Sequence, residues 1–466
     1  MKNFRRPILI LPIVLALIFV PMLTSGYAEL SLGQSSTDAH EQSVHYEVAA
    51  QRLPWRSDLY EQAGLAAMSA TEYSRAIGLF GMAGRQAALS ADGRLELGQA
   101  YLLTDKPDRA IEVWKALLTD GQAGGAASRS LSGLYHQQGR FGDEEQVLRQ
   151  WLRVEPDNSE AQYGLGLLLF SQASPEALPL LDAVAARGPA SLKSHVQGLH
   201  STLETALAQP DVSQRLVICG RTLAAVGEWP LAEQSFLRAL QADKHSAPAW
   251  AWLGEARQQT GDGSATQAFD RALALSPSSA EIHAMAGLYW QGQKNWPKAF
   301  SEFQTAARLE PQNSVWQMSL GDVSVHLGDL VKGLAYYQAA VNLAPRDAQT
   351  WSALALFSVE NDVDVEGLGR DAALRAYALQ PGSGQVLDIL GRTLLATAQW
   401  DTAELFFKKA IAAGPNDAAP NFHLGLLYLQ TNKPDLARQY LQAAQALDPN
   451  GPIGAQAANA LVRYLP

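Results

Sequence analysis

The feature that most constrains this chain is a repeat of 34 residues near its C-terminal end. Residues 384–417 and 418–451 carry the same residue types at matching places. The matched pairs are Leu390-Gly391 with Leu424-Gly425, Leu394 with Tyr428, Ala403 with Ala437, Phe407 with Leu441, Ala410 with Ala444, and Pro415 with Pro449. A fixed period of this size is typical of stacked helical hairpins, because one hairpin cannot bury its apolar face alone.

Each repeat is predicted to form helix A, a turn, helix B and a second turn. Leu390, Gly391 and Leu394 lie on one face of helix A, since they stand at i, i+1 and i+4. A glycine inside a helix costs about 0.5–1 kcal/mol relative to alanine, so its recurrence indicates close approach of a neighbouring helix. We expect Ala403 of helix B to pack against Gly391, and Pro415 to end helix B because proline lacks an amide hydrogen.

The same Gly, Ala, Ala spacing, of 12 and then 7 residues, occurs five times along the chain. The further copies are Gly64/Ala76/Ala83, Gly220/Ala232/Ala239 and Gly287/Ala299/Ala306. Together with the Leu-Gly, aromatic and Pro positions, this order resembles the tetratricopeptide repeat (TPR) family over about residues 57–449. The resemblance implies an all-α fold: a right-handed superhelix, or solenoid, of about eleven helix-turn-helix units. The alternative is a generic alanine-rich helical bundle.

Composition favours a folded helical protein and excludes several functions. Hydrophobic residues make up 47% and charged residues 18%, which argues against disorder. The net charge of -10 disfavours a nucleic-acid partner, which requires concentrated Lys and Arg. Cys219 is the single cysteine, so neither an internal disulfide nor a cysteine metal site is possible, and we interpret it as a small buried apolar residue.

The N-terminal residues 1–28 have the pattern of a signal peptide or membrane anchor. Lys2, Arg5 and Arg6 precede an almost wholly apolar run, and small residues at Gly26 and Ala28 suit a cleavage site. Membrane association through residues 8–24 stays open, because the run is about as long as a short transmembrane helix. Both alternatives place the body of the protein outside the cytoplasm, as a soluble periplasmic or secreted protein after cleavage near Ala28 or as an anchored one.

The remaining boundaries follow from the repeat pattern. We expect a polar linker at 29–42, an N-terminal array with a half-unit cap at 43–188, an irregular connecting helix at 189–212, a C-terminal array at 213–450 and a capping helix at 451–466. The connecting helix is the predicted site of a bend. Partner identity, pathway and oligomeric state do not follow from the sequence.

No catalytic or metal-binding pattern stands out. There is no glycine-rich phosphate loop after a strand, no Gly-x-Ser-x-Gly elbow and no His-Glu-x-x-His motif. We therefore predict a protein that is not an enzyme, with no catalytic residue, no metal and no cofactor.

The resemblance implies that a protein or peptide partner binds the inner, concave face formed by the helices A. Matching position to position, this face is predicted to include Arg129, His136, Tyr163, Phe170, Arg221, Glu255, Gln258, Met318, Asp322, His326, Asp388, Arg392, Phe422 and Leu426. The face lacks the Lys, Asn and Arg set that holds a C-terminal carboxylate in chaperone-binding members of the family. A short peptide and a helix that docks in the groove both remain possible ligands of this face.

Three functions follow as hypotheses. The first is an exported, non-catalytic interaction scaffold. The second is a membrane-anchored component of an envelope-polymer or protein export and assembly machine. The third is an enzyme with a site in the groove, which would require loss of turnover on changing Asp388 or Asp322.

Overall fold

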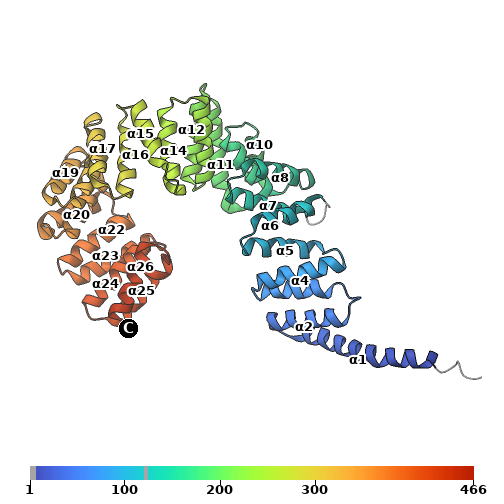
Figure 1. Cartoon of the computed structure of the whole chain (residues 1–466). Helices are drawn as coiled ribbons and strands as arrows, with labels where there is room; N and C mark the ends of the chain where they lie inside the picture. The colour runs from blue at the N-terminus through green and yellow to red at the C-terminus, as the bar shows by residue number, and fades with distance from the viewer. Residues whose placement is uncertain (1–6, 120–123, 466) are drawn as a thin grey trace, which may run out of the picture. The chain divides into compact units, whose positions relative to one another are not determined.

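The computed structural model describes residues 7–119 and 124–465, with side chains from residue 19 onward. It divides into two compact units, residues 1–242 and 243–466. Within the described residues every regular element is a helix, and successive helices pair as antiparallel hairpins (Figure 1). The all-α fold of stacked hairpins that the repeat predicts is confirmed.

The described residues of the first unit form six hairpins and one single helix. Its helices are α1 (Pro7–Ser35), α2 (Ala39–Arg52), α3 (Leu59–Ser69), α4 (Tyr73–Gln86), α5 (Ala91–Leu103), α6 (Pro107–Thr119), α7 (Gly124–Gln137), α8 (Phe141–Val154), α9 (Ser159–Ser171), α10 (Ala177–Arg187), α11 (Ala190–Leu207), α12 (Val212–Ala225) and α13 (Trp229–Ala242). The single helix is α11.

The second unit holds six hairpins and a terminal helix. Its helices are α14 (Ala247–Thr260), α15 (Ala265–Leu275), α16 (Ala280–Gly292), α17 (Trp296–Leu309), α18 (Ser314–His326), α19 (Leu330–Leu343), α20 (Ala348–Glu360), the π-helical turn η1 (Val365–Gly369), α21 (Arg370–Leu379), α22 (Gly384–Ala396), α23 (Trp400–Ala413), α24 (Ala418–Gln430), α25 (Pro434–Leu447) and α26 (Pro452–Tyr464). The terminal helix α26 packs on α25 and α24, so it covers the end of the stack.

The repeated glycine of helix A makes room for a ring on helix B. A Cβ atom at Gly391 would lie 2.6 Å from the ring of Phe407. Ala403, the expected partner, is also fully buried. The three atoms nearest to such a Cβ atom all belong to the ring 16 residues after the glycine, so the closest approach comes from Phe407 and not from Ala403. The same contact recurs as Gly64 with Phe80, Gly220 with Phe236, and Gly287 with Phe303, and at Gly425 the branched side chain of Leu441 takes the place of the ring.

The turn between helix A and helix B contains a residue with positive φ at the same place in every hairpin from α3–α4 to α24–α25. It stands seven residues after the position that Gly391 occupies. Four of the eleven are glycine: Gly139, Gly227, Gly261 and Gly328. The others are Thr71, Asp105, Ala173, Lys294, Asp362, Ala398 and Asn432. Residues other than glycine rarely adopt a positive φ. We infer that the packing of helix A against helix B keeps the turn in this conformation at the seven positions without glycine.

The hairpin of α20 accommodates two extra residues in its acidic turn. Asp364 adopts a φ of 43°, and its carboxylate accepts hydrogen bonds from the amides of Gly367 at 3.2 Å and Leu368 at 3.1 Å. The insertion forms the π-helical turn η1 before α21 begins. The two extra residues lengthen the repeat period from 34 to 36 residues at this point, and the Asp364 hydrogen bonds hold them in the turn.

The N-terminal segment differs from the expected polar linker and half-unit cap. Helix α1 continues to Ser35 and pairs with α2, so the two form a complete hairpin. Leu30 is buried in this contact, and a Cβ atom at Gly26 would lie 2.7 Å from the side chain of Leu53. The polar residues of the stretch bind α2: Glu29 accepts from Arg52 at 3.1 Å and contacts His45 at 2.6 Å. The basic residues Lys2, Arg5 and Arg6 lie outside the described residues.

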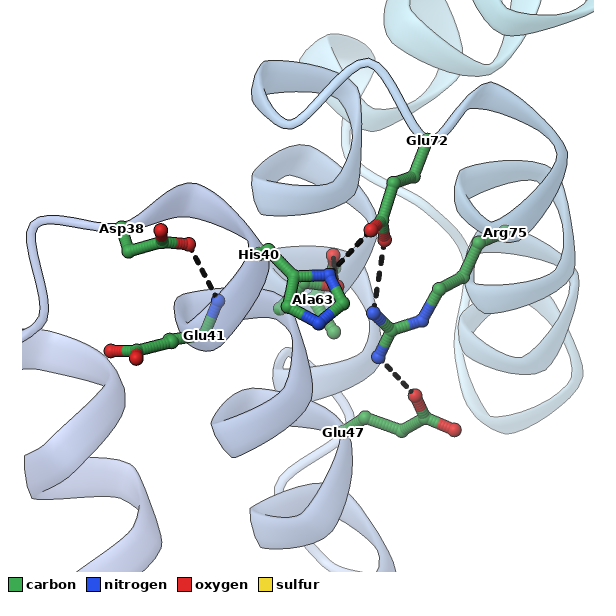
Figure 2. Close-up of polar contacts among 8 residues, drawn as sticks. Asp38, His40, Glu41, Glu47, Ala63, Glu72 and Arg75 are labelled. Carbon is green, nitrogen blue, oxygen red and sulfur yellow. Dashed lines mark hydrogen bonds and ion pairs between the residues drawn. The ribbon is translucent and has the colours of Figure 1, made fainter.

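Helix α2 is joined to the next hairpin by polar contacts (Figure 2). His40 of α2 contacts the carboxylate of Glu72, which also accepts from Arg75 at 3.0 Å. Arg75 in turn donates to Glu47 of α2 at 2.7 Å. The Ser43 hydroxyl of α2 also donates a buried hydrogen bond to the carbonyl of Ala63 in α3, at 2.9 Å, and this bond joins α2 to α3.

Helix α11 lies inside the first unit, whereas the division between the units falls after residue 242. Its apolar side is buried through Val196, Leu199 and Leu203, and it packs on α10 and α12. Helix α9 reaches past it to α12 and α13. Ser235 of α13 donates to the carbonyl of Ser171 at 2.7 Å, which joins the hairpins on either side of α11.

Candidate functional site

The helices A of the second unit carry three adjoining cavities along one face. The side chain of Leu356 on α20 lines all three, and Glu360 and Gln385 each line two. We call the three together the inner groove. Its walls come mainly from α18, α20, α22, α24 and α26, and Tyr337 of α19 adds to the wall at one end.

The first cavity, of about 320 Å³, lies between α20 and the start of α22. We call it the neutral cavity, because its lining contains no charged side chain. The lining residues are Gln349, Ser352, Ala353, Leu356, Gln380, Ser383, Gln385 and Val386.

The second cavity, of about 360 Å³, is lined by charged residues from α20, α22 and α24. Arg392 of α22 donates to Glu360 of α20 at 2.8 Å. The Nδ1 atom of His423 lies 2.8 Å from a carboxylate oxygen of Asp388, which is itself buried. Asp417 completes the charged part of this lining.

The third cavity, of about 270 Å³, lies between α18 and α20. Here the hydroxyl of Tyr337 donates to Asp322. Desolvation by the surrounding helices raises the pKa of Asp322, and the Tyr337 hydrogen bond opposes this effect. The ring of His326 stacks on Trp296 with centroids 4.1 Å apart. This end of the groove therefore combines a carboxylate with aromatic surface.

Four of the residues predicted for the binding face line the inner groove: Asp322, His326, Asp388 and Arg392. The other predicted residues of the second unit lie differently. Phe422 is buried and packs beside the His423 ring, while Leu426 and Met318 are half-buried. Glu255 accepts from Gln259 at 2.9 Å. The buried Oε1 atom of Gln258 has no hydrogen-bond partner among the described residues.

In the first unit, the predicted residues are engaged with their own chain. Arg129 forms an exposed ion pair with Glu160 at 2.6 Å. Tyr163 is half-buried with its ring 6.3 Å from that of His195, and Arg221 is exposed. Phe170 was predicted wrongly as a surface contact: it is fully buried, because the following hairpin covers α9 on this side.

His136 bridges two carboxylates from distant parts of the first unit. Its Nδ1 atom lies 3.1 Å from Glu144 of α8, and its Nε2 atom lies 3.3 Å from Glu228 in the turn before α13. Hydrogen bonds to Glu144 and then Glu228 raise the pKa of His136 to about 10, so the imidazole is charged at neutral pH. Burial raises the pKa of Glu144, which His136 partly offsets. The arrangement joins helix hairpins on the two sides of α11.

Sequence reasoning missed several groove residues: Ser352, Leu356, Glu360, Gln385 and His423. The first three stand 34 residues after Met318, Asp322 and His326, which were predicted. Applying the period once more would have found them. The extra residues in the acidic turn of the α20 hairpin shift the count to 36 immediately afterwards.

Three further observations describe the chemical groups in the described part of the chain. No group of three or more His, Cys, Asp or Glu side chains is placed there to hold a metal ion. Burial raises the pKa of the Cys219 thiol to about 12, so this thiol stays protonated at neutral pH. Among the residues whose side chains the structure describes, from residue 19 onward, no helix is both long and apolar enough for a membrane crossing.

Comparison with known proteins identifies the repeat. The family model described as tetratricopeptide repeat matches residues 104–154, 220–280, 283–348 and 390–452, which together exceed half of the chain. Anaphase-promoting complex subunit 3 of Schizosaccharomyces pombe is 23% identical over 157 residues, covering 34% of this chain and 24% of that protein. Protein O-mannosyl-transferase TMTC1 of Mus musculus is 25% identical over 142 residues, covering 29% and 15%. The chain thus spans a quarter or less of the length of these curated relatives.

Solved structures of other repeat proteins resemble this one weakly. The Cut9–Hcn1 hetero-tetramer of the APC/C aligns over 97% of this chain and 94% of that chain, with 17% identity and a TM-score of 0.44. The family assignment therefore depends on the repeat model. With matches spread from residue 104 to residue 452, this chain belongs to the tetratricopeptide repeat family.

Proposed function

We propose that this protein is a non-catalytic interaction scaffold that binds an extended segment of a partner protein in the inner groove. The observation that carries the proposal is the run of three adjoining cavities on one helix A face. Membership of a repeat family that binds proteins supports the general kind of partner. An extended segment suits a groove whose subsites follow one another from α18 to α26.

The charges of the groove favour a partner segment with basic residues. Two of the three cavities contain carboxylates: Asp322, Glu360, Asp388 and Asp417. Two basic side chains lie among these carboxylates: Arg392 pairs with Glu360, and His423 pairs with Asp388. Asp322 accepts a hydrogen bond from the Tyr337 hydroxyl, and it forms no ion pair with any described residue of the chain. A Lys or Arg side chain of the ligand would complement this end of the groove.

The test is binding of fixed peptides to the full-length protein. Capped octapeptide libraries with Lys, Glu or Leu at one fixed position are offered to the wild type and to an Asp322→Asn/Glu360→Gln double variant. We expect the Lys libraries to bind best, and the double variant to bind them about fivefold more weakly. A control variant, Glu281→Gln/Asp435→Asn, removes two exposed acids outside the groove lining. No binding by the wild type, or equal binding by all three proteins, would refute the groove proposal.

We further propose that the N-terminal helix is retained as a membrane anchor, with the repeat array held outside the cytoplasm. The supporting observation is the packing of α1 on α2 through Gly26, Glu29 and Leu30. Cleavage after Ala28 would divide helix α1 within this contact and remove Ser25, which accepts from Arg52. The apolar run before residue 24 would then lie in the bilayer.

The N-terminus of the protein from washed membranes decides between anchoring and cleavage. Mass spectrometry should find peptides from residues before Ala28 in the membrane fraction. A chain beginning at Glu29, recovered in soluble form, would contradict retention. Alkaline phosphatase fused after residue 466 should be active if the array lies outside the cytoplasm, and inactivity would contradict export.

A further inference from the structure

The neutral cavity differs from its two neighbours in the chemistry of its walls. Its polar side chains are three glutamines and two serines, contributed by α20, the end of α21 and the start of α22. Gln349 and Gln385 are exposed at its mouth, and Leu356 and Val386 form apolar wall. Amide and hydroxyl groups each both donate and accept hydrogen bonds, so this lining suits a ligand group that does the same.

Ser352 is the member of this lining that lacks a partner. Its residue is only 5% exposed, and its buried Oγ atom has no hydrogen-bond partner among the described residues. Buried serines nearby are satisfied: Ser324 donates to the carbonyl of Leu320 at 2.7 Å, and Ser358 donates to that of Val363. Because buried hydroxyls are almost always hydrogen-bonded, a lone one in a cavity wall indicates a missing partner from outside.

We propose that the neutral cavity binds the carboxamide side chain of an asparagine or glutamine in the partner segment. The inference rests on the proposed function, since it names one side chain of the segment that occupies the inner groove. The carboxamide oxygen accepts from the Ser352 hydroxyl, and the amide group exchanges hydrogen bonds with Gln349 or Gln385. The cavity of about 320 Å³ is at the lower end of ligand-pocket sizes, which suits a single side chain.

Other side chains fit the walls less well. A carboxylate or an ammonium group would enter a cavity with no charged lining residue to pair with it. An aliphatic side chain would exclude water from Ser352 and the glutamines without replacing their hydrogen bonds. Beyond Leu356, the adjoining cavities supply carboxylates, so the neutral preference is confined to one position of the ligand.

The experiment measures which side chain the full-length protein selects at this position. The probes are N-acetylated, C-amidated octapeptide libraries in which one position is fixed as Gln, Asn, Leu, Glu or Lys and the others are equimolar mixtures. Each library is titrated onto the purified wild type and onto the single variants Ser352→Ala and Gln385→Leu. Thermal unfolding checks that each variant folds. Ser352→Ala should be at least as stable as the wild type, because it removes an unpaired buried hydroxyl.

Two control variants have the same chemistry outside the cavity. Ser324→Ala removes a buried hydroxyl that is already satisfied within α18. Gln439→Leu removes an exposed glutamine on α25, which lines none of the three cavities. Neither should alter the choice among the libraries.

The expected result is a preference for Gln or Asn at one position, reduced about fivefold in Ser352→Ala and in Gln385→Leu. Binding without this preference, or a preference that both variants retain, would overturn the assignment of the neutral cavity and leave the groove proposal standing. Absence of binding to every library would overturn the groove proposal and the pocket with it.

Discussion

The two units are built from the same hairpin, yet they use the inner positions of helix A differently. In the first unit, Arg129 and His136 at these positions are engaged by Glu160, Glu144 and Glu228 of the same unit. In the second unit, the corresponding positions line three adjoining cavities. Position in the repeat therefore indicates where a side chain points, but not whether the chain itself already supplies its partner.

The difference follows from the interruption at α11. Because α9 contacts α12 and α13 directly, the turn that carries Glu228 comes to lie beside His136, 92 residues earlier in the chain. Among the described residues of the second unit, each helix A contacts the helix A of a neighbouring hairpin in the stack, as α18 does with α20 and α22 with α24. Substitutions at inner positions should accordingly affect stability in the first unit and ligand binding in the second.

The largest expected effect tests what the two units share. Phe236→Ala in the first unit and Phe407→Ala in the second each remove a fully buried ring that packs on a helix A glycine. Each should lower the free energy of unfolding by about 3–5 kcal/mol, measured by urea unfolding followed by circular dichroism. A large loss in one unit with none in the other would show that the glycine–ring contact is not common to both.

The next effect is specific to the first unit. His136→Leu leaves the buried Glu144 carboxylate without its cation, which should lower the free energy of unfolding by about 2–3 kcal/mol. The double variant His136→Leu/Glu144→Leu should recover most of this loss, because an apolar pair replaces the ion pair. Equal losses in the single and double variants would show that His136 acts through packing alone.

The pH dependence of unfolding separates charge from packing at His136. The pKa of this imidazole is raised from 6.5 to about 10 in the folded protein. Its contribution to stability is therefore complete below pH 6.5 and is lost as the pH rises from 6.5 through 10. Wild-type unfolding measured at pH 7 and pH 10 should show this loss, and His136→Leu should lack it. The same slope in both proteins would assign the loss to other groups.

The sequence predicted the hairpins well because their positions are fixed by packing. The Gly, Ala, Ala spacing identified the buried faces, although the atoms nearest to a Cβ at Gly391 belong to the Phe407 ring. Of the α1–α2 hairpin only a half-unit cap was expected, because an apolar run followed by polar residues is also typical of an export signal and a linker. Its polar residues, such as Glu29, bind α2 instead of solvent.

The candidate site was predicted only where the register of helix A sets the position of a residue. Asp388 and Arg392 follow from the register of helix A, and both line the groove. The bridge from His136 to Glu228 depends on how α9 meets α12 and α13, and that contact leaves no periodic trace in the sequence. Ser352 has the correct register, but its missing hydrogen bond is a property of the packed structure.

A smaller effect should be found at the small buried positions of the regular stack. Ala403→Leu and Ala437→Leu insert a large side chain where the alanine is fully buried between helices of the second unit. Each should cost about 1–3 kcal/mol through overpacking, seen as a lower midpoint in thermal unfolding. If neither substitution lowers the unfolding midpoint, the helices can move apart at these positions without losing stability.

The smallest effect on stability gives the sharpest contrast between the units. Arg129 and Arg392 each pair with one glutamate on a neighbouring helix A, at 2.6 Å and 2.8 Å. Such pairs near the surface contribute about 0–1 kcal/mol, so Arg129→Ala and Arg392→Ala should unfold almost like the wild type.

Binding should distinguish these two arginines. Arg392→Ala releases Glu360, whose carboxylate lines two cavities of the inner groove, and leaves that carboxylate to the ligand. Lys-containing libraries should therefore bind Arg392→Ala more tightly than the wild type, with a steeper dependence on salt. Arg129→Ala should leave binding unchanged, because Glu160 lies in the first unit. An increase in both variants would place the ligand on an acidic surface of the whole chain, since releasing either glutamate would then serve equally well.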